Sequence, residues 1–225
     1  MNLYFLVEGK RTEKKVYTSW FENHVGMTKI SSPDEAKENN FFIISANGYP
    51  GILNEHLENA VNDVKEHGNF DYLVIILDSE ETSESERRDE VMSALQKFGD
   101  KLTNAKPYII IQHRCIETWF LGNNKLKVKN PILGELKNYL TFYNVFENDP
   151  EYMPAHPDFS VHAHFHEAYL KKIFQENNLV YSKRRPGYAK EADFLQQLEE
   201  RNKNCNHLRS MDALFELIEE AMRSQ

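Results

Sequence analysis

The sequence has little cysteine and no long apolar run, and each absence argues against a class of protein. Cys115 and Cys205 are its only cysteines among 225 residues, and neither has a Cys-x-x-Cys partner. This argues against a cysteine-based zinc site, and two distant cysteines without a secretory leader are typical of reduced thiols in the cytoplasm. The apolar runs are far too short to span a bilayer, and no basic leader segment follows Met1. We therefore expect a cytoplasmic protein without a membrane span.

The sequence also has fewer basic than acidic residues. The chain has 27 lysines and arginines against 35 aspartates and glutamates, which gives a formal net charge of −8. Such a charge argues against a protein that coats nucleic acid through bulk electrostatics. It does not exclude an enzyme that acts on nucleic acid, because acids that hold divalent cations add negative charge and the bound cation reverses the local field.

What the sequence does have is an alternation of short apolar runs with amphipathic segments. Continuous apolar runs predict buried strands at residues 3–7, 41–45, 72–77 and 108–111. Helices are expected to follow them: one with Thr12 as its N-cap, one across residues 52–67, one around Val91, and a short one at residues 115–121. This alternation predicts an α/β fold with a mostly parallel sheet flanked by helices on both faces.

The chain changes character after residue 122. Residues 131–160 have several prolines and asparagines and look irregular. Apolar periodicity predicts three further helices, at residues 161–174, 189–201 and 207–222. We expect a core at residues 1–122 and a helical C-terminal extension at residues 123–225. The pattern leaves open that the last helices pack on the sheet, so that the whole chain forms one domain.

Acidic residues follow two of the predicted strands. Glu8 ends the first strand, and Asp78 and Glu80 end the third. Because the carboxyl ends of parallel strands lie along one edge of a sheet, these side chains are expected to converge. Hard oxygen donors of this kind suit Mg²⁺ or Mn²⁺, and Glu13 and Glu117 could join them. The alternative is that these acids cap helices or are solvated in loops.

These acids carry a resemblance to the Toprim domain, the metal-dependent core of topoisomerases, primases and several nucleases. The segment VEGKRTE at residues 7–13 is similar to the E-G-x-x-x-E/D opening of small Toprim proteins of the OLD and RloB kind, which occur in phage-defence loci. Asp78-x-Glu80 resembles the acid pair that follows a later strand of the domain. ETWFL at residues 117–121 and CNHLR at residues 205–209 resemble two further segments of those proteins. The resemblance covers the expected core well and the extension loosely.

The resemblance implies a metal-dependent endonuclease that hydrolyses phosphodiesters in RNA, such as tRNA, or in DNA. It assigns Glu8 as the acid/base and as a metal ligand, and Asp78 and Glu80 as metal ligands, with Glu13 and Glu117 as further candidates. The usual second acid of the pair is aspartate, and the longer Glu80 stands in its place here. The resemblance also implies a role in antiphage defence, controlled by a partner ATPase of the ABC or OLD type. The rival interpretations are another Toprim chemistry and a non-catalytic Toprim-like subunit that binds a partner, and a homodimer stays open.

A basic loop between two predicted helices is the second candidate feature. It contains two tyrosines and four cations: Tyr181, Lys183, Arg184, Arg185, Tyr188 and Lys190. Cations interleaved with aromatic rings suit a phosphate backbone and an unstacked base, so Arg184, Arg185 and Lys190, together with Lys10, are predicted to bind nucleic acid. Lys183 is a catalytic candidate, because a lysine near a metal site stabilises the charge that develops on phosphate. A solvated inter-helix loop is the alternative.

Two other groups of residues are interpreted as structural. His162 and His166, two of four histidines between residues 156 and 166, have the spacing that places them on one helix face. No acidic or cysteine ligand is evidently paired with them, so we expect structural or surface histidines rather than a zinc site. The alternating Lys125, Lys127 and Lys129 are interpreted as a charged loop.

Overall fold

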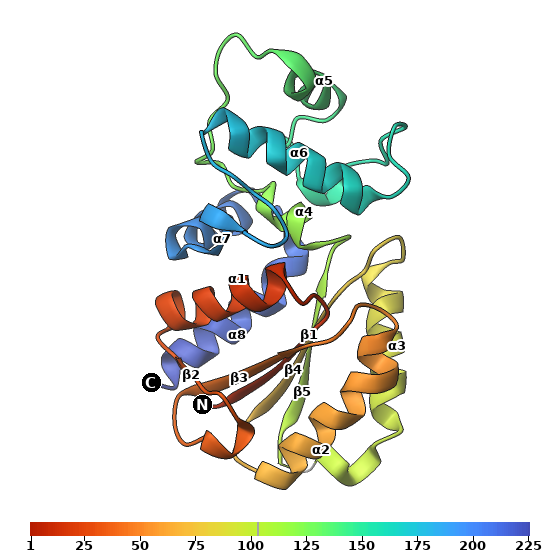
Figure 1. Ribbon diagram of the computed structural model, residues 1–225, viewed down its shortest axis with the longest axis vertical. Helices are drawn as coiled ribbons and strands as arrows, with labels where there is room; N and C mark the ends of the chain where they lie inside the picture. The colour runs from red at the N-terminus through yellow and green to blue at the C-terminus, as the bar shows by residue number, and fades with distance from the viewer. Residues whose placement is uncertain (103) are drawn as a thin grey trace.

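The computed structural model describes residues 1–102 and 104–225 and is built around a parallel β-sheet (Figure 1). Within these residues the sheet has five strands in the order β2-β3-β1-β4-β5, and every neighbouring pair is parallel. The strands are β1 (Leu3–Val7), β2 (Thr28–Lys29), β3 (Asn40–Ser45), β4 (Tyr72–Asp78) and β5 (Lys106–Gln112). The predicted α/β fold with a parallel sheet is confirmed.

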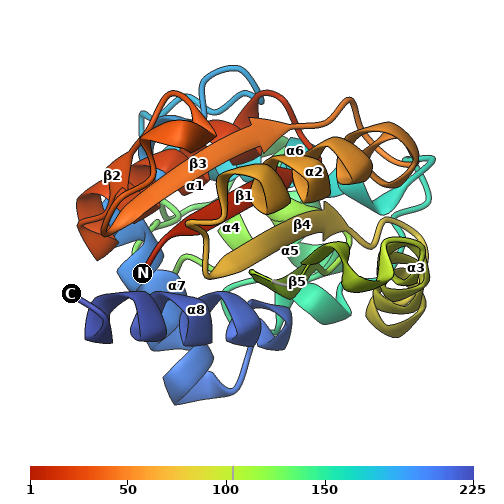
Figure 2. The ribbon, with the colours of Figure 1, turned by 90° about the horizontal axis from the view of Figure 1, so that it is seen from below.

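Alternation of side chains along the strands divides the core into two layers. One face of the sheet is covered by α1 (Thr12–Trp20) and α8 (Asp212–Arg223), and the other by α2 (Leu57–His67) and α3 (Glu84–Gln96) (Figures 1 and 2). Leu3, Phe5 and Val7 belong to the buried cluster of the first face. Tyr4 and Leu6 belong to the cluster of the second face. Because the strands are buried on both sides, their sequences are continuously apolar.

The chain changes its direction of travel across the sheet beside β1. From β1 it passes through α1 to β2 and β3 on one side, and from β3 it crosses by way of α2 to β4 on the other side of β1. The carboxyl ends of β1 and β4 therefore form a topological switch point, the place where open parallel sheets bind ligands. Glu8 directly follows β1, and Asp78 is the last residue of β4.

The remaining helices extend the molecule beyond the carboxyl edge of the sheet. They are α4 (Ile116–Phe120), α5 (Gly134–Phe142), α6 (His162–Glu176) and α7 (Ala192–Cys205). In Figure 1, α6 lies above the carboxyl ends of the strands, and α8 returns along the sheet. Tyr72 Oη donates to Glu220 Oε1 and Tyr108 Oη donates to Ala213 O, both at 2.8 Å, and these bonds hold α8 to β4 and β5. One apolar cluster joins this face of the sheet to the extension.

Some element boundaries differ from the sequence interpretation. Thr12 is not the N-cap of α1: Arg11 has that position, and Thr12 Oγ1 donates instead to the backbone oxygen of Lys183 at 3.1 Å. A long-range partner for the hydroxyl therefore replaces the local cap. Residues 131–160 were expected to be irregular but contain α5, which buries only Leu136 and Tyr139 and so has a weak apolar period. The two exposed residues of β2 gave no strand pattern at all.

Short helical turns complete the chain. They are π-helical at Phe21–Val25 and Ile52–His56 and 3₁₀ at Pro33–Glu35, Gly99–Leu102, Pro150–Tyr152, Gly187–Lys190 and Arg209–Met211. Gly187–Lys190 lies in the basic loop singled out from the sequence, immediately before α7. Over the two described ranges, no helix combines the length and the apolar character needed to cross a bilayer.

Candidate active site

The five acids predicted to hold a metal line one pocket at the carboxyl edge of the sheet. The pocket has a volume of about 520 Å³ and lies between the ends of β1 and β4 and the first turn of α6. Its acidic residues are Glu8, Glu13, Asp78, Glu80 and Glu117, and Lys183 lines the same space. The fold thus brings together residues from distant parts of the sequence. We call this space the carboxylate pocket.

Glu8 is held in place by backbone N–H groups. Its Oε1 accepts a hydrogen bond from the N–H of Tyr49 at 3.1 Å, and its Oε2 accepts one from the N–H of Asp78 at 3.0 Å. Burial raises the pKa of Glu8 above its ordinary value, and the two N–H donors oppose part of that rise. A carboxylate that is oriented by the backbone and binds its proton more tightly than usual is suited to accept a proton near neutral pH.

Asp78 has an oxygen without a partner. Its Oδ1 atom is buried and has no hydrogen-bond partner among the residues that the structure describes. Burial, and then the negative charges of the neighbouring acids, raise the pKa of Asp78 well above its usual range. A buried polar atom without a partner costs free energy unless a ligand satisfies it. This atom is therefore free to bind a ligand that enters the pocket.

Glu13 and Glu117 contribute two buried acids from the helices α1 and α4. Glu117 is 1 % exposed, and its Oε1 accepts a hydrogen bond from the hydroxyl of Tyr181 at 2.7 Å. Burial raises the pKa of Glu13 to about 7, and the charges of Glu117 and Glu8 add to this rise. Acids that disfavour one another's ionisation in this way are stabilised when a positive charge enters between them.

Gly9 leaves the space into which the side chain of Glu13 folds. A Cβ atom at residue 9 would lie 1.9 Å from Oε2 of Glu13 and 2.3 Å from its Oε1, closer than real Cβ atoms come to any neighbour. Any side chain at this position therefore has to displace the carboxylate of Glu13. Glycine is therefore needed at residue 9 to leave room for the carboxylate of Glu13.

We expect Gly9→Ala to weaken Mn²⁺ binding about tenfold, because it moves a candidate ligand without removing its charge. The melting temperature should change little, since only the end of a flexible side chain has to shift. Calorimetric titration with MnCl₂ measures the affinity. Gly51→Ala is the matched control, because a Cβ at residue 51 meets nothing within 4 Å. Equal Mn²⁺ affinities in the two variants would contradict this role of Gly9.

Glu80 differs from the other acids because its side chain is 55 % exposed. Its backbone is left-handed, with a φ of 52°. The buried guanidinium of Arg87 lies 3.9 Å from Glu80 Oε2 and 3.7 Å from the centroid of the Tyr49 ring. Arg87 thus connects the acidic turn after β4 with the turn whose backbone donates to Glu8. Through these contacts it positions both acids from outside the pocket.

The donor set fits a hard divalent cation, although it is not preassembled. Over residues 1–102 and 104–225, no group of three or more Asp, Glu, His or Cys side chains is already arranged to hold a metal ion. Glu8 and Glu117 instead accept hydrogen bonds from backbone N–H groups and from Tyr181. Oxygen donors around the unpartnered Asp78 atom are nevertheless the chemistry that Mg²⁺ and Mn²⁺ prefer.

Lys183 brings a positive charge to the acids. Its Nζ atom lies 4.0 Å from Glu167 Oε2 on α6. Partial burial by itself lowers the pKa of Lys183, but the negative charges of Glu117 and Glu167 outweigh burial and raise the pKa above its ordinary value. The backbone of the lysine is fixed to α1 by the hydrogen bond from Thr12 Oγ1. Lys183 therefore stays charged at neutral pH beside the acids, as its predicted role requires.

The other predicted nucleic-acid-binding residues line a second cleft. This cleft has a volume of about 680 Å³, runs along α1, and is lined by Lys10, Arg184, Arg185 and Lys190 among others. Lys10 also lines the carboxylate pocket, so the two spaces adjoin. We call the second cleft the α1 groove. The structure thus brings the basic loop next to the acids, although the two lie far apart in the sequence.

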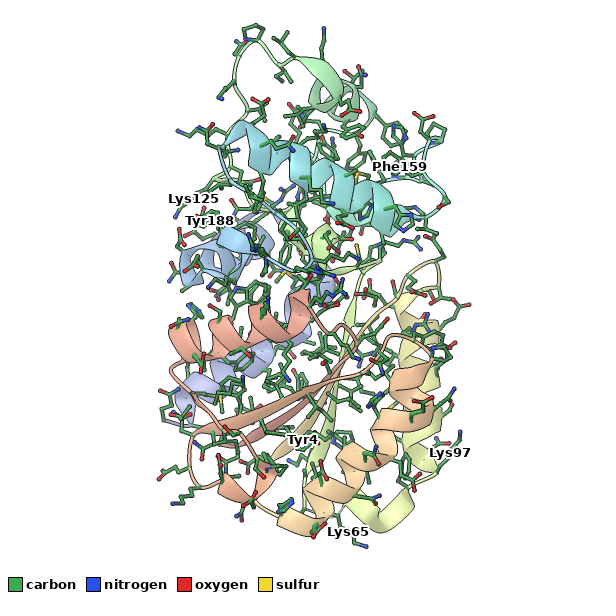
Figure 3. All side chains as sticks on the ribbon, in the orientation of Figure 1. Tyr4, Lys65, Lys97, Lys125, Phe159 and Tyr188 are labelled. Atoms are coloured by element: carbon green, nitrogen blue, oxygen red, sulfur yellow. The ribbon has the colours of Figure 1, made fainter. Side chains whose placement is uncertain are left out.

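One of the two tyrosines of the basic loop is not placed as the sequence suggested. Tyr181 is 4 % exposed and its hydroxyl is bound to Glu117. Tyr188 is half-buried and its hydroxyl donates to Asp193 at 2.6 Å. Figure 3 shows Tyr188 near Lys125, whose Nζ lies 4.0 Å from the same Asp193. The expectation that the Tyr181 ring stacks on a base is wrong, because this ring is buried. The same expectation for the half-buried ring of Tyr188 stays a prediction.

The histidines of α6 are engaged in local contacts. His166 is buried with Nδ1 at 2.8 Å from Thr118 Oγ1, and burial lowers its pKa to about 3. His162 Nδ1 lies 2.6 Å from Oε2 of Glu81. His164 lines the carboxylate pocket, which its sequence position did not indicate.

The sequence analysis did not identify the residues that orient the acids. Tyr49 donates its backbone N–H to Glu8, and Arg87 packs on the face of the Tyr49 ring. Tyr181, from a loop far along the chain, donates its hydroxyl to Glu117. One signal could have pointed to Tyr49: the turn at residues 46–51 contains Gly48 and Gly51, and glycine allows a backbone to come close to another group. No matching signal exists for Arg87 or Tyr181.

No family model matches the chain, and no match is found among curated proteins or solved structures.

Proposed function

We propose that this chain is a Mg²⁺- or Mn²⁺-dependent nuclease that hydrolyses phosphodiester bonds. The observation that carries the proposal is the meeting of five acids at the switch point, around a buried Asp78 oxygen that lacks a partner among the described residues. The adjoining α1 groove supplies cations for an anionic polymer. Metal-dependent hydrolysis of phosphodiesters commonly uses acids that ligate the metal next to cations that bind phosphate.

The residues of the chain divide the chemistry among them. A divalent cation bound here would polarise the scissile phosphate and lower the pKa of a bound water. Glu8, oriented by two backbone N–H groups, is proposed to accept the proton of the attacking water. Lys183 is proposed to stabilise the negative charge that develops on the phosphate oxygens. The proposed metal ligands are Glu8, Glu13, Asp78, Glu80 and Glu117.

The resemblance to small Toprim proteins of the OLD and RloB kind extends this proposal. It points to RNA, such as tRNA, or to DNA as the substrate, and to a defence role against phage in the cytoplasm. A partner ATPase of the ABC or OLD type would restrain or trigger the cleavage. The adjacency of strand–Glu8-Gly9 and strand–Asp78-x-Glu80 on β1 and β4 supports the resemblance in the placement of its acids, and the substrate, defence role and partner rest on the resemblance alone.

Cleavage of a mixed panel of nucleic acids tests the proposal. Plasmid DNA, single-stranded DNA and total tRNA are incubated with the chain and Mg²⁺ or Mn²⁺, and the fragments are resolved on gels. The native chain should cleave at least one class, EDTA should stop the reaction, and Glu8→Gln should slow it by about 10²-fold or more. Glu81→Gln is the matched control, because Glu81 pairs with His162 outside the carboxylate pocket.

The same panel separates the nuclease from its main rival. If neither the native chain alone nor the native chain with an ATPase of the ABC or OLD type from the same source cleaves any substrate, the chain is better explained as a subunit that binds a partner. Equal cleavage by the native chain and by Glu8→Gln would contradict the role of Glu8. Cleavage that persists in EDTA would contradict the dependence on a metal.

A further inference from the structure

The α1 groove holds more positive charge than the contacts predicted from the sequence. Four of its cations were predicted to bind nucleic acid, and three further lysines, Lys14, Lys15 and Lys29, also line it. Glu22 is the acidic residue on its wall. Seven cations against one acid, on a chain with a net charge of −8, make the groove a local concentration of positive charge. Such a concentration attracts a polyanion.

The cations of the groove are largely left without acidic partners. In the part of the chain that the structure describes, Lys190 is the groove cation that forms an ion pair, with Glu191 at 3.7 Å. By contrast, Lys171 and Lys172 on α6 each pair with a carboxylate at 2.6 Å. Partial burial, and then the charge of Lys29, lower the pKa of Lys14. The free chain therefore bears a like-charge repulsion that an anionic ligand would relieve.

One wall of the groove is fixed to α1 by hydrogen bonds. Lys15 Nζ donates to the backbone oxygen of Arg184 at 2.6 Å. Ser182 and Arg185 exchange backbone hydrogen bonds of 3.0 and 2.8 Å, which closes a tight turn and leaves the side chains of Arg184 and Arg185 exposed. The wall is therefore preformed, so a ligand that binds it does not have to order it first.

The lining of the groove favours phosphate over bases. No aromatic ring is among its lining residues, whose uncharged members are Thr18, Ser19, Asn23, Pro186 and Gly187. Recognition of single-stranded bases usually relies on stacking against aromatic rings, and these are absent from the groove lining. Contacts with phosphate hold a strand in register but carry no information about its sequence. The groove is thus suited to a backbone rather than to a particular base.

We propose that the α1 groove binds the sugar-phosphate backbone of the substrate strand next to the phosphate in the carboxylate pocket, without regard to base sequence. This role rests on the proposed nuclease function and adds Lys14, Lys15 and Lys29 as backbone-binding residues. Lys10 lines both spaces and marks the passage from one to the other. Because α1 runs from the carboxyl edge toward β2 in Figure 1, the strand follows the helix away from the acids.

Binding of labelled oligonucleotides in EDTA tests the groove separately from cleavage. The probes are oligo(U) and oligo(A) of about 12 nucleotides, and fluorescence anisotropy is recorded between about 50 and 200 mM KCl. The Lys14→Gln/Lys29→Gln variant should reduce the slope of log K against log salt by about 0.7 for each cation removed, and should weaken binding about tenfold near 150 mM salt. Lys15 is left unchanged because it holds Arg184 in place.

The matched control is Lys127→Gln/Lys129→Gln, which removes two exposed lysines outside the groove. It should bind like the native chain. An unchanged salt slope in the groove variant, an equal loss in the control, or a strong preference for one of the two homopolymers would overturn the proposal. Groove-dependent binding without any metal-dependent cleavage would contradict the nuclease alone, whereas cleavage with an unchanged slope would contradict the groove alone.

Discussion

Asp78→Asn is expected to stabilise the metal-free chain while slowing phosphodiester cleavage about 10³-fold. The neutral amide removes the charge that burial and the neighbouring acids disfavour, as the raised pKa of Asp78 indicates. At about pH 8 the melting temperature in EDTA should therefore rise by about 3 °C. The same change removes a candidate metal ligand, so single-turnover cleavage in Mn²⁺ should fall. This one substitution should therefore raise the melting temperature and lower the cleavage rate.

The opposite signs make this expectation easy to refute. Asp193→Asn is the control, since Asp193 is exposed and accepts a hydrogen bond from Tyr188 on the outer side of the extension. This control should leave both the melting temperature and the cleavage rate nearly unchanged. If Asp78→Asn lowered the melting temperature in EDTA and cleaved at the native rate, Asp78 would be a structural acid and not a ligand.

Without metal, the chain is expected to lose stability between about pH 5 and pH 8, and Mn²⁺ should restore it. Burial raises the pKa of Glu13 from 4.5 to about 7, so the folded chain holds a proton that the unfolded chain releases. This contribution is fully present below pH 4.5 and is lost as the pH rises through about 7. It amounts to on the order of 3 kcal/mol, or about 5 °C or more in melting temperature. A cation binds the ionised acids and so stabilises most at the alkaline end.

Two buried groups elsewhere in the chain help to isolate the effect. Burial raises the pKa of Glu151 to about 7 as well, but Glu151 lies outside the carboxylate pocket. Burial lowers the pKa of His166 from 6.5 to about 3, so its contribution rises with pH over that interval and opposes the slope from Glu13. The melting temperatures of Glu13→Gln, Glu151→Gln and the native chain are therefore measured at each pH. Differences between them remove the contributions that all three share, such as that of His166. If Mn²⁺ raised the melting temperature of Glu13→Gln as much as that of the native chain, Glu13 would not be a metal ligand.

The sheet and the position of the acids could be predicted because both follow from local pattern. A parallel strand that is buried on both faces leaves a continuous apolar run, and the first charged residue after the run marks the carboxyl edge. Glu8 and Asp78 were located in this way, and the pairing of β1 with β4 places them side by side. The unpredicted β2 and α5 are short elements with little buried surface, whose apolar signal is correspondingly weak.

The partners of the acids could not be predicted because they come from tertiary contacts. A tyrosine beside arginines has the same pattern whether its ring faces solvent or the core. The packing of Phe174 and Phe120 around Tyr181 decides that its ring faces inward, and its hydroxyl then reaches Glu117. In the same way, the sequence around Thr12 is typical of a helix N-cap, but the Thr12 hydroxyl donates instead to the backbone oxygen of Lys183, far along the chain.

One short segment of the basic loop serves both clefts. Tyr181 holds Glu117, Lys183 lines the carboxylate pocket, and Arg184 and Arg185 line the α1 groove. Under the proposed function, the positive charge of a cation in one cleft and the negative charge of a strand in the other attract each other across this fixed segment, and such coupling is reciprocal. A bound strand would then tighten the hold on the metal as much as the metal tightens the hold on the strand. The chain would accordingly hold its metal most firmly when its substrate is already in place.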